Sequence, residues 1–181
     1  LDPHTYYVAN YAPFNIFNEL DNNFINLNVL DAKFQFELKY KPIAGLELAA
    51  LGAFKYAATS QEHNVTENSN QAMTYRAMSN AIIRNSNRYL YRDPEHPYDL
   101  PMSVLPIGGI YHKNENRMSN YDFRATATYT RTFAQKHTIN LFGGAEMTDL
   151  LRTRTGFEGW GMQYNSGEVP FYIYQYLKKG I

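Results

Sequence analysis

Two stretches of the chain alternate strongly between apolar and polar residues, and each has a tight turn in its middle. The second stretch runs from Tyr121 to Met147. Because strand side chains point alternately to two faces, it predicts a β-hairpin with strands at 121–133 and 137–148. One face carries Tyr121, Phe123, Ala125, Ala127, Tyr129 and Phe133, and the other carries Asp122, Arg124 and four Thr residues.

The first stretch has the same design around the turn sequence Pro-Ile-Ala-Gly at 42–45, where Pro and Gly favour a chain reversal. It predicts strands at about 30–41 and 46–58. The apolar face of its first strand carries Leu30, Ala32, Phe34, Phe36, Leu38 and Tyr40, and the other face carries Asp31, Lys33, Gln35, Glu37, Lys39 and Lys41.

Three segments without strand periodicity, at 1–29, 59–120 and 149–181, are predicted to be long loops. NIFNEL in the first has the composition of a short helical turn. In the second, Ser69 is a candidate N-cap for a helix that extends to about Arg84, since Ala and Met favour a helix there. The rest of that segment contains four prolines and the pair Gly108-Gly109, which predicts an irregular loop with a tight turn.

Charges across the two predicted hairpins indicate how the strands pair. With the first turn centred on Ile43 and the second on Gln135, opposite charges face each other, which stabilises an antiparallel pair. A shift by two residues would keep the faces but lose these pairs. The pairs are Lys39 with Glu47, Asp31 with Lys55 and Arg124 with Glu146.

Composition narrows the class of protein. The formal charge is zero, with 17 basic and 17 acidic residues, which argues against a nucleic-acid-binding protein. There is no Cys, so disulfide frameworks and Cys-ligated metals are excluded. No segment reaches the roughly 18 uninterrupted apolar residues of a membrane helix. The chain does not begin with Met, and we expect it to be a piece of a longer protein.

Alternation alone is compatible with a soluble β-sandwich or with an antiparallel transmembrane β-barrel segment. The barrel is favoured because tight turns alternate with long loops, as periplasmic turns and extracellular loops do in outer-membrane barrels. Strands of about 12 residues at about 3.3 Å each, tilted by about 45°, cover some 28 Å of a bilayer. Tyr40, Tyr56, Tyr121 and Phe133 end the apolar faces, as an aromatic girdle does, and Arg131 lies near the turn, where it can reach the interface.

Several short sequence segments of the chain resemble the SusC/RagA family of TonB-dependent outer-membrane transporters of the Bacteroidetes. They are KYKPIAGLEL at 39–48, GGIY at 108–111 before an Asn-rich stretch, and the pattern Y-x-R-x-F-x-x-K-H-x-I-N-x-x-x-G-x-E that begins at Tyr129. The resemblance spans most of the chain.

The resemblance implies a middle section of a 22-stranded barrel, about four strands in two hairpins, without the N-terminal plug. It further implies an outer-membrane importer of oligosaccharides or peptides for nutrient uptake, with a SusD-like surface lipoprotein as its lid and energy supplied through TonB. Cofactors, metals and enzymatic activity are not expected. The alternative is a soluble, secreted or surface β-rich domain that binds a ligand through its loops.

Candidate binding residues are aromatic and polar side chains in the predicted loops. Trp160 and Tyr164 lie in a Gly-rich segment, where a ring can stack on a sugar or a peptide side chain; packing of the loops against each other is the competing interpretation. The charged residues of the predicted pairs are expected to be structural, on the lumen face. The further candidates, which can reach the lumen or the partner, are Arg76, Arg84, Asn85, Tyr89, Tyr91 and Arg92.

Other motifs carry a plainer interpretation. The five histidines fall in separate predicted loops or turns without metal-ligand spacing, which predicts exposed side chains. Glu146 and Asp122 are expected to be structural rather than an acid–base pair. Gly-Phe-Glu-Gly-Trp-Gly at 156–161 lacks the Lys and the strand–helix setting of a phosphate loop.

Overall fold

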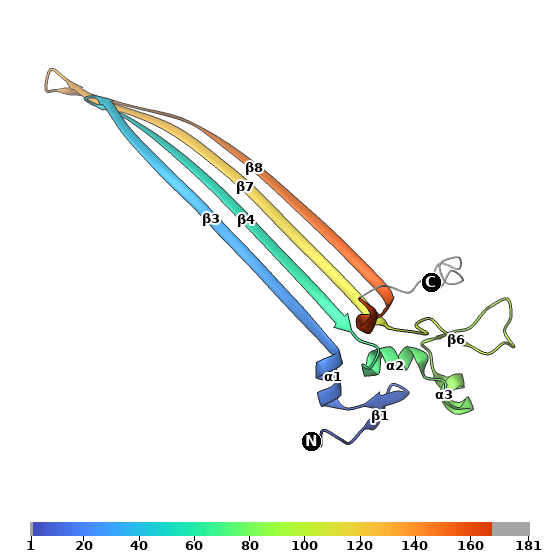
Figure 1. The fold of residues 1–181 in the computed structure, drawn as a ribbon. Helices are drawn as coiled ribbons and strands as arrows, with labels where there is room; N and C mark the ends of the chain where they lie inside the picture. The colour runs from blue at the N-terminus through green and yellow to red at the C-terminus, as the bar shows by residue number, and fades with distance from the viewer. Residues whose placement is uncertain (1, 168–181) are drawn as a thin grey trace. The chain divides into compact units, whose positions relative to one another are not determined.

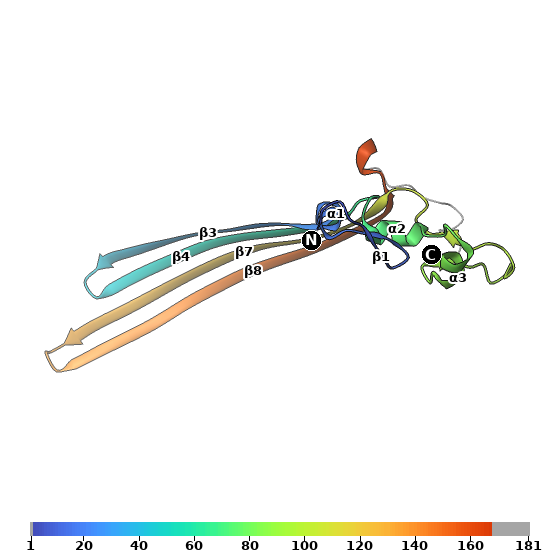
Figure 2. The ribbon, with the colours of Figure 1, turned by 90° about the horizontal axis from the view of Figure 1, so that it is seen from below.

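The computed structural model describes residues 2–167, and they form mostly antiparallel β-sheet with a few short helices. Four long strands run side by side in the order β3-β4-β7-β8 (Figures 1 and 2). Their bounds are Asn23–Ile43 for β3, Leu46–Val65 for β4, Gly109–Phe133 for β7 and His137–Met162 for β8. Within the described part of the chain this sheet is open, so β3 and β8 are its edges.

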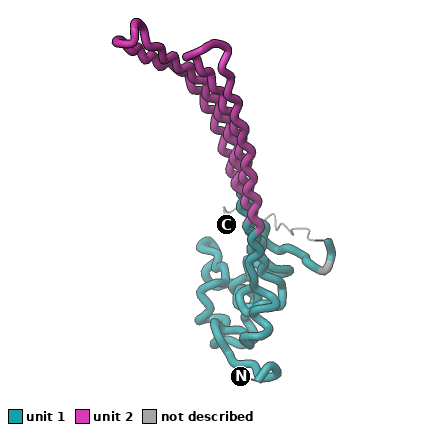
Figure 3. The backbone as a smooth tube through the Cα atoms, turned by 90° about the vertical axis from the view of Figure 1, so that its left-hand side faces the viewer, with its two compact units in different colours: residues 1–27, 61–114, 156–181 teal, residues 28–60, 115–155 magenta. Residues whose placement is uncertain are grey.

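The chain divides into two compact units (Figure 3). Unit 2 consists of residues 28–60 and 115–155, and unit 1 holds the remaining residues. Unit 2 contains both tight turns and the strand stretches that alternate between apolar and polar residues. Unit 1 contains the long connections, the helices and the far ends of the four strands.

All four strands are longer than the sequence predicts. The added stretches are 23–29, 59–65, 109–120 and 149–162, which were expected to be loops. In segments such as HKNEN and RTRT both faces carry polar residues, so the contrast with period two disappears although the backbone stays extended. The two predicted hairpins are present. The second turn is centred on Gln135 as predicted, whereas the first lies at Ala44 and Gly45, because Pro42 and Ile43 still belong to β3.

The turn of the first hairpin ends at Gly45, whose φ is +89°. This backbone conformation is strained for any residue with a side chain and typical of a hairpin turn that closes with a bulge. A Cβ at Gly45 would collide with the carbonyl oxygen of Thr130 on β7. Both the backbone conformation and the lack of space therefore require glycine at this position.

The register of the first hairpin differs from the predicted one. Lys41, not Lys39, forms the ion pair with Glu47, at 3.0 Å, and Lys39 instead pairs with Glu37 on its own strand at 3.1 Å. The ring of Phe36 lies over Gly52. Both cross-strand contacts correspond to a shift of two residues, which keeps the predicted faces because side chains alternate with period two.

The register of the second hairpin agrees with the prediction. Arg124 contacts Glu146 at 3.0 Å, and further pairs on the same face follow the same spacing around Gln135. These pairs are Asp122 with Thr148 at 2.9 Å, Thr130 with Asn140 at 3.3 Å and Thr132 with Thr138 at 3.0 Å. In the turn itself, Ala134 and Gln135 have φ of 50° and 55°.

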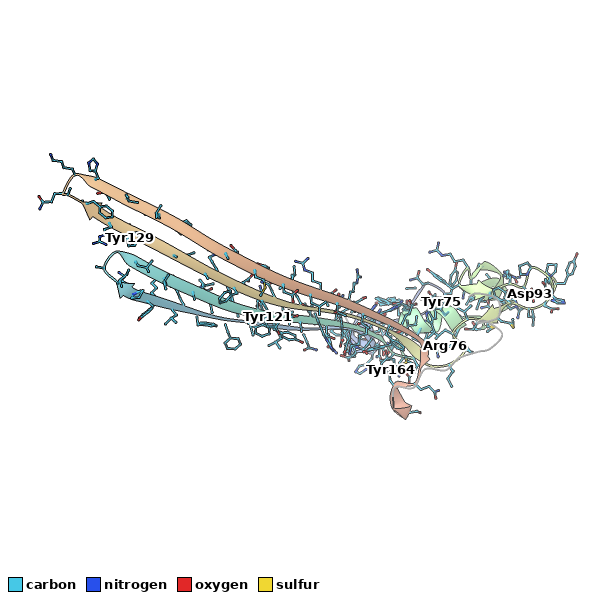
Figure 4. All side chains as sticks on the ribbon, turned by 90° about the horizontal axis from the view of Figure 1, so that it is seen from above. Tyr75, Arg76, Asp93, Tyr121, Tyr129 and Tyr164 are labelled. Atoms are coloured by element: carbon cyan, nitrogen blue, oxygen red, sulfur yellow. The ribbon has the colours of Figure 1, made fainter. Side chains whose placement is uncertain are left out.

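Within the described residues, the apolar face of unit 2 is exposed. Every buried hydrophobic residue that the structure describes belongs to unit 1. In unit 2, by contrast, Phe34, Phe36 and Leu38 are exposed by 67%, 68% and 65%. Tyr121 and Tyr129 lie at separate points along β7 (Figure 4), and the ring of Tyr121 packs on Phe54 with centroids 4.8 Å apart. This unit is therefore a two-faced sheet layer rather than a packed sandwich.

Unit 1 has a small core made by Val65, Ala72, Leu105 and Ile110, with Tyr75 and Trp160 packed against it. A small hairpin of β1 (Tyr7–Ala9) and β2 (Ala12–Phe14) lies in this unit. The helix α1 (Ile16–Asn22) follows it and confirms the short helical turn that the sequence predicts there. A second small pair is formed by β5 (Leu90–Tyr91) and β6 (Met102–Ser103), and a short helical turn, η1 (Tyr164–Ser166), follows β8.

The helix expected from Ser69 to Arg84 is two helices. Ser69 is the N-cap as predicted and accepts a hydrogen bond from the Ala72 amide, but α2 covers only Asn70–Arg76. Asn80 caps a second helix, α3 (Ala81–Ser86). Asn favours helix caps over helix interiors, because its side chain satisfies free backbone groups. The Asn87 amide then bonds the carbonyls of Thr74 and Ala77, which holds the break between the helices in place.

Candidate functional site

The polar face of unit 2 carries paired charges on neighbouring strands. Arg124 on β7 contacts Glu146 directly opposite on β8 at 3.0 Å, as the sequence predicts. Lys55 on β4 also contacts Asp31 on β3 at 3.2 Å, but diagonally, because the shifted register places Lys33 opposite Lys55. The predicted Lys39–Glu47 pair is wrong because the first hairpin is shifted by two residues. All these side chains are well exposed, so each pair adds little stability.

A hollow of about 380 Å³ lies on this polar face of unit 2. Three strands form it: Ala57 and Thr59 come from β4, the segment 116–118 from β7, and Arg152 to Arg154 from β8. The register of the β7–β8 hairpin places Asn116 opposite Arg154 and Met118 opposite Arg152. Arg152 and Arg154 have no ion-pair partner among residues 2–167, unlike Arg124.

In unit 1, two histidines, an acid and the single Trp of the chain form a second group, the histidine–tryptophan cluster (His63, His112, Glu158 and Trp160). The rings of His63 on β4 and His112 on β7 stack with centroids 5.9 Å apart. Glu158 on β8 accepts a hydrogen bond from Trp160 Nε1 at 2.6 Å, and its other oxygen lies 3.7 Å from His112 Nδ1.

The surroundings of His63 favour its neutral form. Its Nε2 lies 2.7 Å from Asn23 Oδ1, and burial lowers the pKa of His63, with the neighbouring His112 acting in the same direction. Burial disfavours a charged imidazole, and a second cation beside it does so further. The prediction that the histidines lie in separate loops is therefore wrong for this pair, since two strands longer than expected bring them together.

Trp160 and Tyr164 do not lie in an open loop. The Gly-rich segment around Trp160 is the end of β8, and the Trp160 ring packs edge-on against Tyr75 with centroids 5.4 Å apart. The Tyr164 hydroxyl donates a hydrogen bond to the carbonyl of Ile110 at 2.9 Å. Figure 4 labels Tyr75 and Tyr164 in their places. Both candidates therefore have packing roles in unit 1, and their predicted roles as ligand contacts stay predictions.

The other predicted binding residues also have structural contacts. Arg92 donates to the carbonyls of Arg84 and Asn85 and so caps the end of α3. Arg76, at the end of α2, donates to the carbonyl of Glu67, and burial lowers its pKa while Glu67 opposes that shift. Tyr89 packs against Tyr75 at 5.3 Å, and Tyr91 lies in β5.

Sequence reasoning missed Arg152 and Arg154 because it placed them in a loop. A signal was present: the two residues lie on the same even-numbered face of β8 as Glu146 and Thr148, beyond Leu150. Extending the alternation beyond residue 148 would have placed both guanidinium groups on that face.

Sequence reasoning also missed the asparagines that hold unit 1 together. The Asn70 side chain donates to the carbonyls of Ala9, Ala12 and Pro13, and Asn15 both caps α1 and donates to the carbonyl of Thr5. Single asparagines in an Asn-rich chain give no periodic signal, so these roles depend on the tertiary fold.

Among residues 2–167, one group of side chains has the spacing of metal ligands, at Asp93, Glu95 and His96. Its geometry follows from a tight turn: Asp93 accepts hydrogen bonds from the Glu95 amide, and the His96 amide bonds the Asp93 carbonyl. The turn accounts for the arrangement without a metal.

Comparison with protein-family models and with curated proteins gives no match for this chain. Among the described residues, no helix has the length and apolar character needed to cross a membrane.

Proposed function

We propose that the chain is a wall segment of an outer-membrane β-barrel, in a TonB-dependent importer of oligosaccharides or peptides that works with a SusD-like surface lipoprotein. The observation that carries the proposal is the apolar face of unit 2, which is exposed within residues 2–167. Phe34, Phe36 and Leu38 expose about two thirds of their surface, and leaving such side chains in water costs about 1.5–3 kcal/mol each. Lipid is the cover that a barrel wall would have.

The dimensions of the strands support the same assignment. Strands of 20 to 26 residues reach about 65–85 Å, more than twice the thickness of a hydrocarbon core. In β4 and β7 the apolar face ends away from the turns, in polar stretches such as SQEHN and HKNEN, whereas β3 keeps exposed apolar side chains at Ile25, Leu27 and Val29. The division in β4 and β7 fits strands that cross a bilayer and then continue into water on the side of the long connections.

The distribution of aromatic and basic side chains near the turns also fits an interface with lipid headgroups. Tyr40 and Phe133 are exposed near the turns of their hairpins. Arg131 lies two residues before Phe133, on the same face of β7. Its guanidinium packs over the Phe133 ring at 5.4 Å and donates to the Tyr129 hydroxyl at 3.4 Å. An arginine so placed can reach the headgroups while its stem lies along apolar surface.

The test uses the full-length protein that contains this chain. We expect it to fractionate with the outer membrane, to require detergent for extraction and to migrate differently on a gel before and after heating. Recovery as a freely soluble monomer would overturn the proposal, because the apolar face of unit 2 would then need a protein cover and the soluble-domain interpretation would be favoured.

A further inference from the structure

We propose that Arg152 and Arg154 form a subsite for the carboxylate groups of an acidic substrate. The inference rests on the proposed function, because it takes the polar face of unit 2 as the surface that substrate meets. It goes beyond that function in naming the chemical class of the substrate.

The first support is the absence of a counter-charge. Arg152 and Arg154 project from the same face of one strand, two residues and therefore about 7 Å apart. Neither forms an ion pair among the residues that the structure describes. Two unpaired guanidinium groups on one side of a strand repel each other, and a bound anion removes that repulsion.

The second support is that the nearby carboxylates on this face are already engaged. Asp31 pairs with Lys55 at 3.2 Å, and Asp122 accepts hydrogen bonds from Asn120 and Thr148. The rest of the described polar face is therefore close to charge balance, and Arg152 and Arg154 are its local excess of positive charge.

The third support is the hollow that these two arginines line. It offers about 380 Å³ on the open polar face, with the Asn116 amide and the Thr59 hydroxyl on the strands beside them. A planar guanidinium binds a carboxylate through two parallel hydrogen bonds, and neighbouring amide and hydroxyl groups suit the uncharged part of the same ligand.

The carboxylates can come from an acidic sugar or from an acidic peptide, so the experiment uses one probe of each kind. Trigalacturonate and triglutamate are titrated into the full-length protein in detergent at low ionic strength, with neutral maltotriose as the reference. We expect at least one acidic probe to bind, and the probe that binds identifies the source of the carboxylate. Raising the salt concentration should weaken that binding.

The double variant R152Q/R154Q should bind the acidic probe about tenfold or more weakly, because each charge-assisted hydrogen bond is stronger than its neutral counterpart. The matched control R131Q/K136Q removes two positive charges from the same hairpin, outside the hollow, and should bind as the native protein does. If the double variant does not assemble, the single variants R152Q and R154Q should each weaken binding measurably.

Equal affinity in the native protein and R152Q/R154Q would overturn the inference, as would an equal loss in the control variant or no binding of either acidic probe. Failure of the proposed function shows separately, in fractionation and heat-dependent gel migration. If the protein is soluble but its binding of an acidic probe still depends on Arg152 and Arg154, the subsite is supported and the proposed importer function is contradicted.

Discussion

Polar side chains in the described residues act mainly by satisfying the backbone, and Asn70 is the clearest case. It is 5% exposed and donates to the carbonyls of Ala9, Ala12 and Pro13 in the β1–β2 hairpin. Asn70→Ala leaves the buried Ala12 carbonyl and its two part-buried neighbours without their donor, which costs about 1–3 kcal/mol locally. We expect amides of the segment 7–14 to exchange hydrogen about tenfold or more faster in the full-length variant. Asn68→Ala, at an exposed neighbouring position, is the control, and equal exchange in both variants would contradict the assigned role.

The surroundings of His63 predict that the stability of unit 1 depends on pH. Burial and His112 lower its pKa below the ordinary value of 6.5, so the folded form binds the proton less readily than the unfolded form. The stabilising contribution is therefore complete above pH 6.5 and is lost as the pH falls toward the lowered pKa. We expect the thermal midpoint to drop between pH 7.5 and pH 5.5, and to drop less in His63→Gln.

The control for this pH dependence is His137→Gln, since His137 is exposed at the start of β8. Other charged groups near His63 are His112 and Glu158, which lies 3.7 Å from His112. An unchanged pH dependence in His63→Gln would contradict the role assigned to His63.

At the scale of the element, the turn between β7 and β8 has a sequence that its backbone disfavours. Ala134 and Gln135 both have positive φ, which strains residues with a Cβ, whereas Asn-Gly prefers this conformation. The double variant A134N/Q135G should therefore stabilise the hairpin by about 1–2 kcal/mol. Unfolding of the full-length protein in denaturant measures this. A loss of stability would show that the Ala134 and Gln135 side chains make contacts that outweigh the strain.

The two faces of β3 should respond oppositely to charge. Phe36→Arg places a cation on the apolar face, which costs about 2–4 kcal/mol in the middle of a bilayer, whereas Gln35→Arg adds the same charge to the polar face. We expect the first variant to assemble poorly in the outer membrane and the second to assemble normally, as measured by the yield of the heat-modifiable form. Equal yields would show that the apolar face does not meet lipid.

The elements that could be predicted from sequence are those in which the two faces differ in polarity. Alternation located both hairpins, and the charges of Arg124 and Glu146 fixed the second register. It failed where both faces are polar, so β7 was expected to start at 121 although it starts at Gly109. The prediction of the register of the β3–β4 hairpin failed because Lys39 and Lys41 share a face of β3. Either lysine can form an ion pair with Glu47, so charge alone does not select one register.

The candidate site was less predictable because it depends on those strand extensions. Arg152, Arg154, His63 and His112 all lie in segments expected to be loops, so their common faces were hidden. Trp160 was placed in a loop for the same reason. Its contacts with Tyr75 and Glu158 are tertiary, and no local pattern indicates them.

At the scale of the whole molecule, the described chain leaves two kinds of surface without a partner. The edges of β3 and β8 carry free backbone donors and acceptors, which readily pair with other strands, and the apolar face of unit 2 is uncovered. We therefore expect the 181-residue chain, expressed alone, to self-associate in aqueous buffer and to be dispersed by detergent. Size-exclusion chromatography with light scattering, in buffer with and without detergent, measures both states.

The charged variant F36R should reduce association through the apolar face but not through the strand edges, so residual oligomers would identify edge pairing. A stable monomer in buffer alone would mean that the chain covers its own apolar face, and it would favour a soluble domain over a barrel wall.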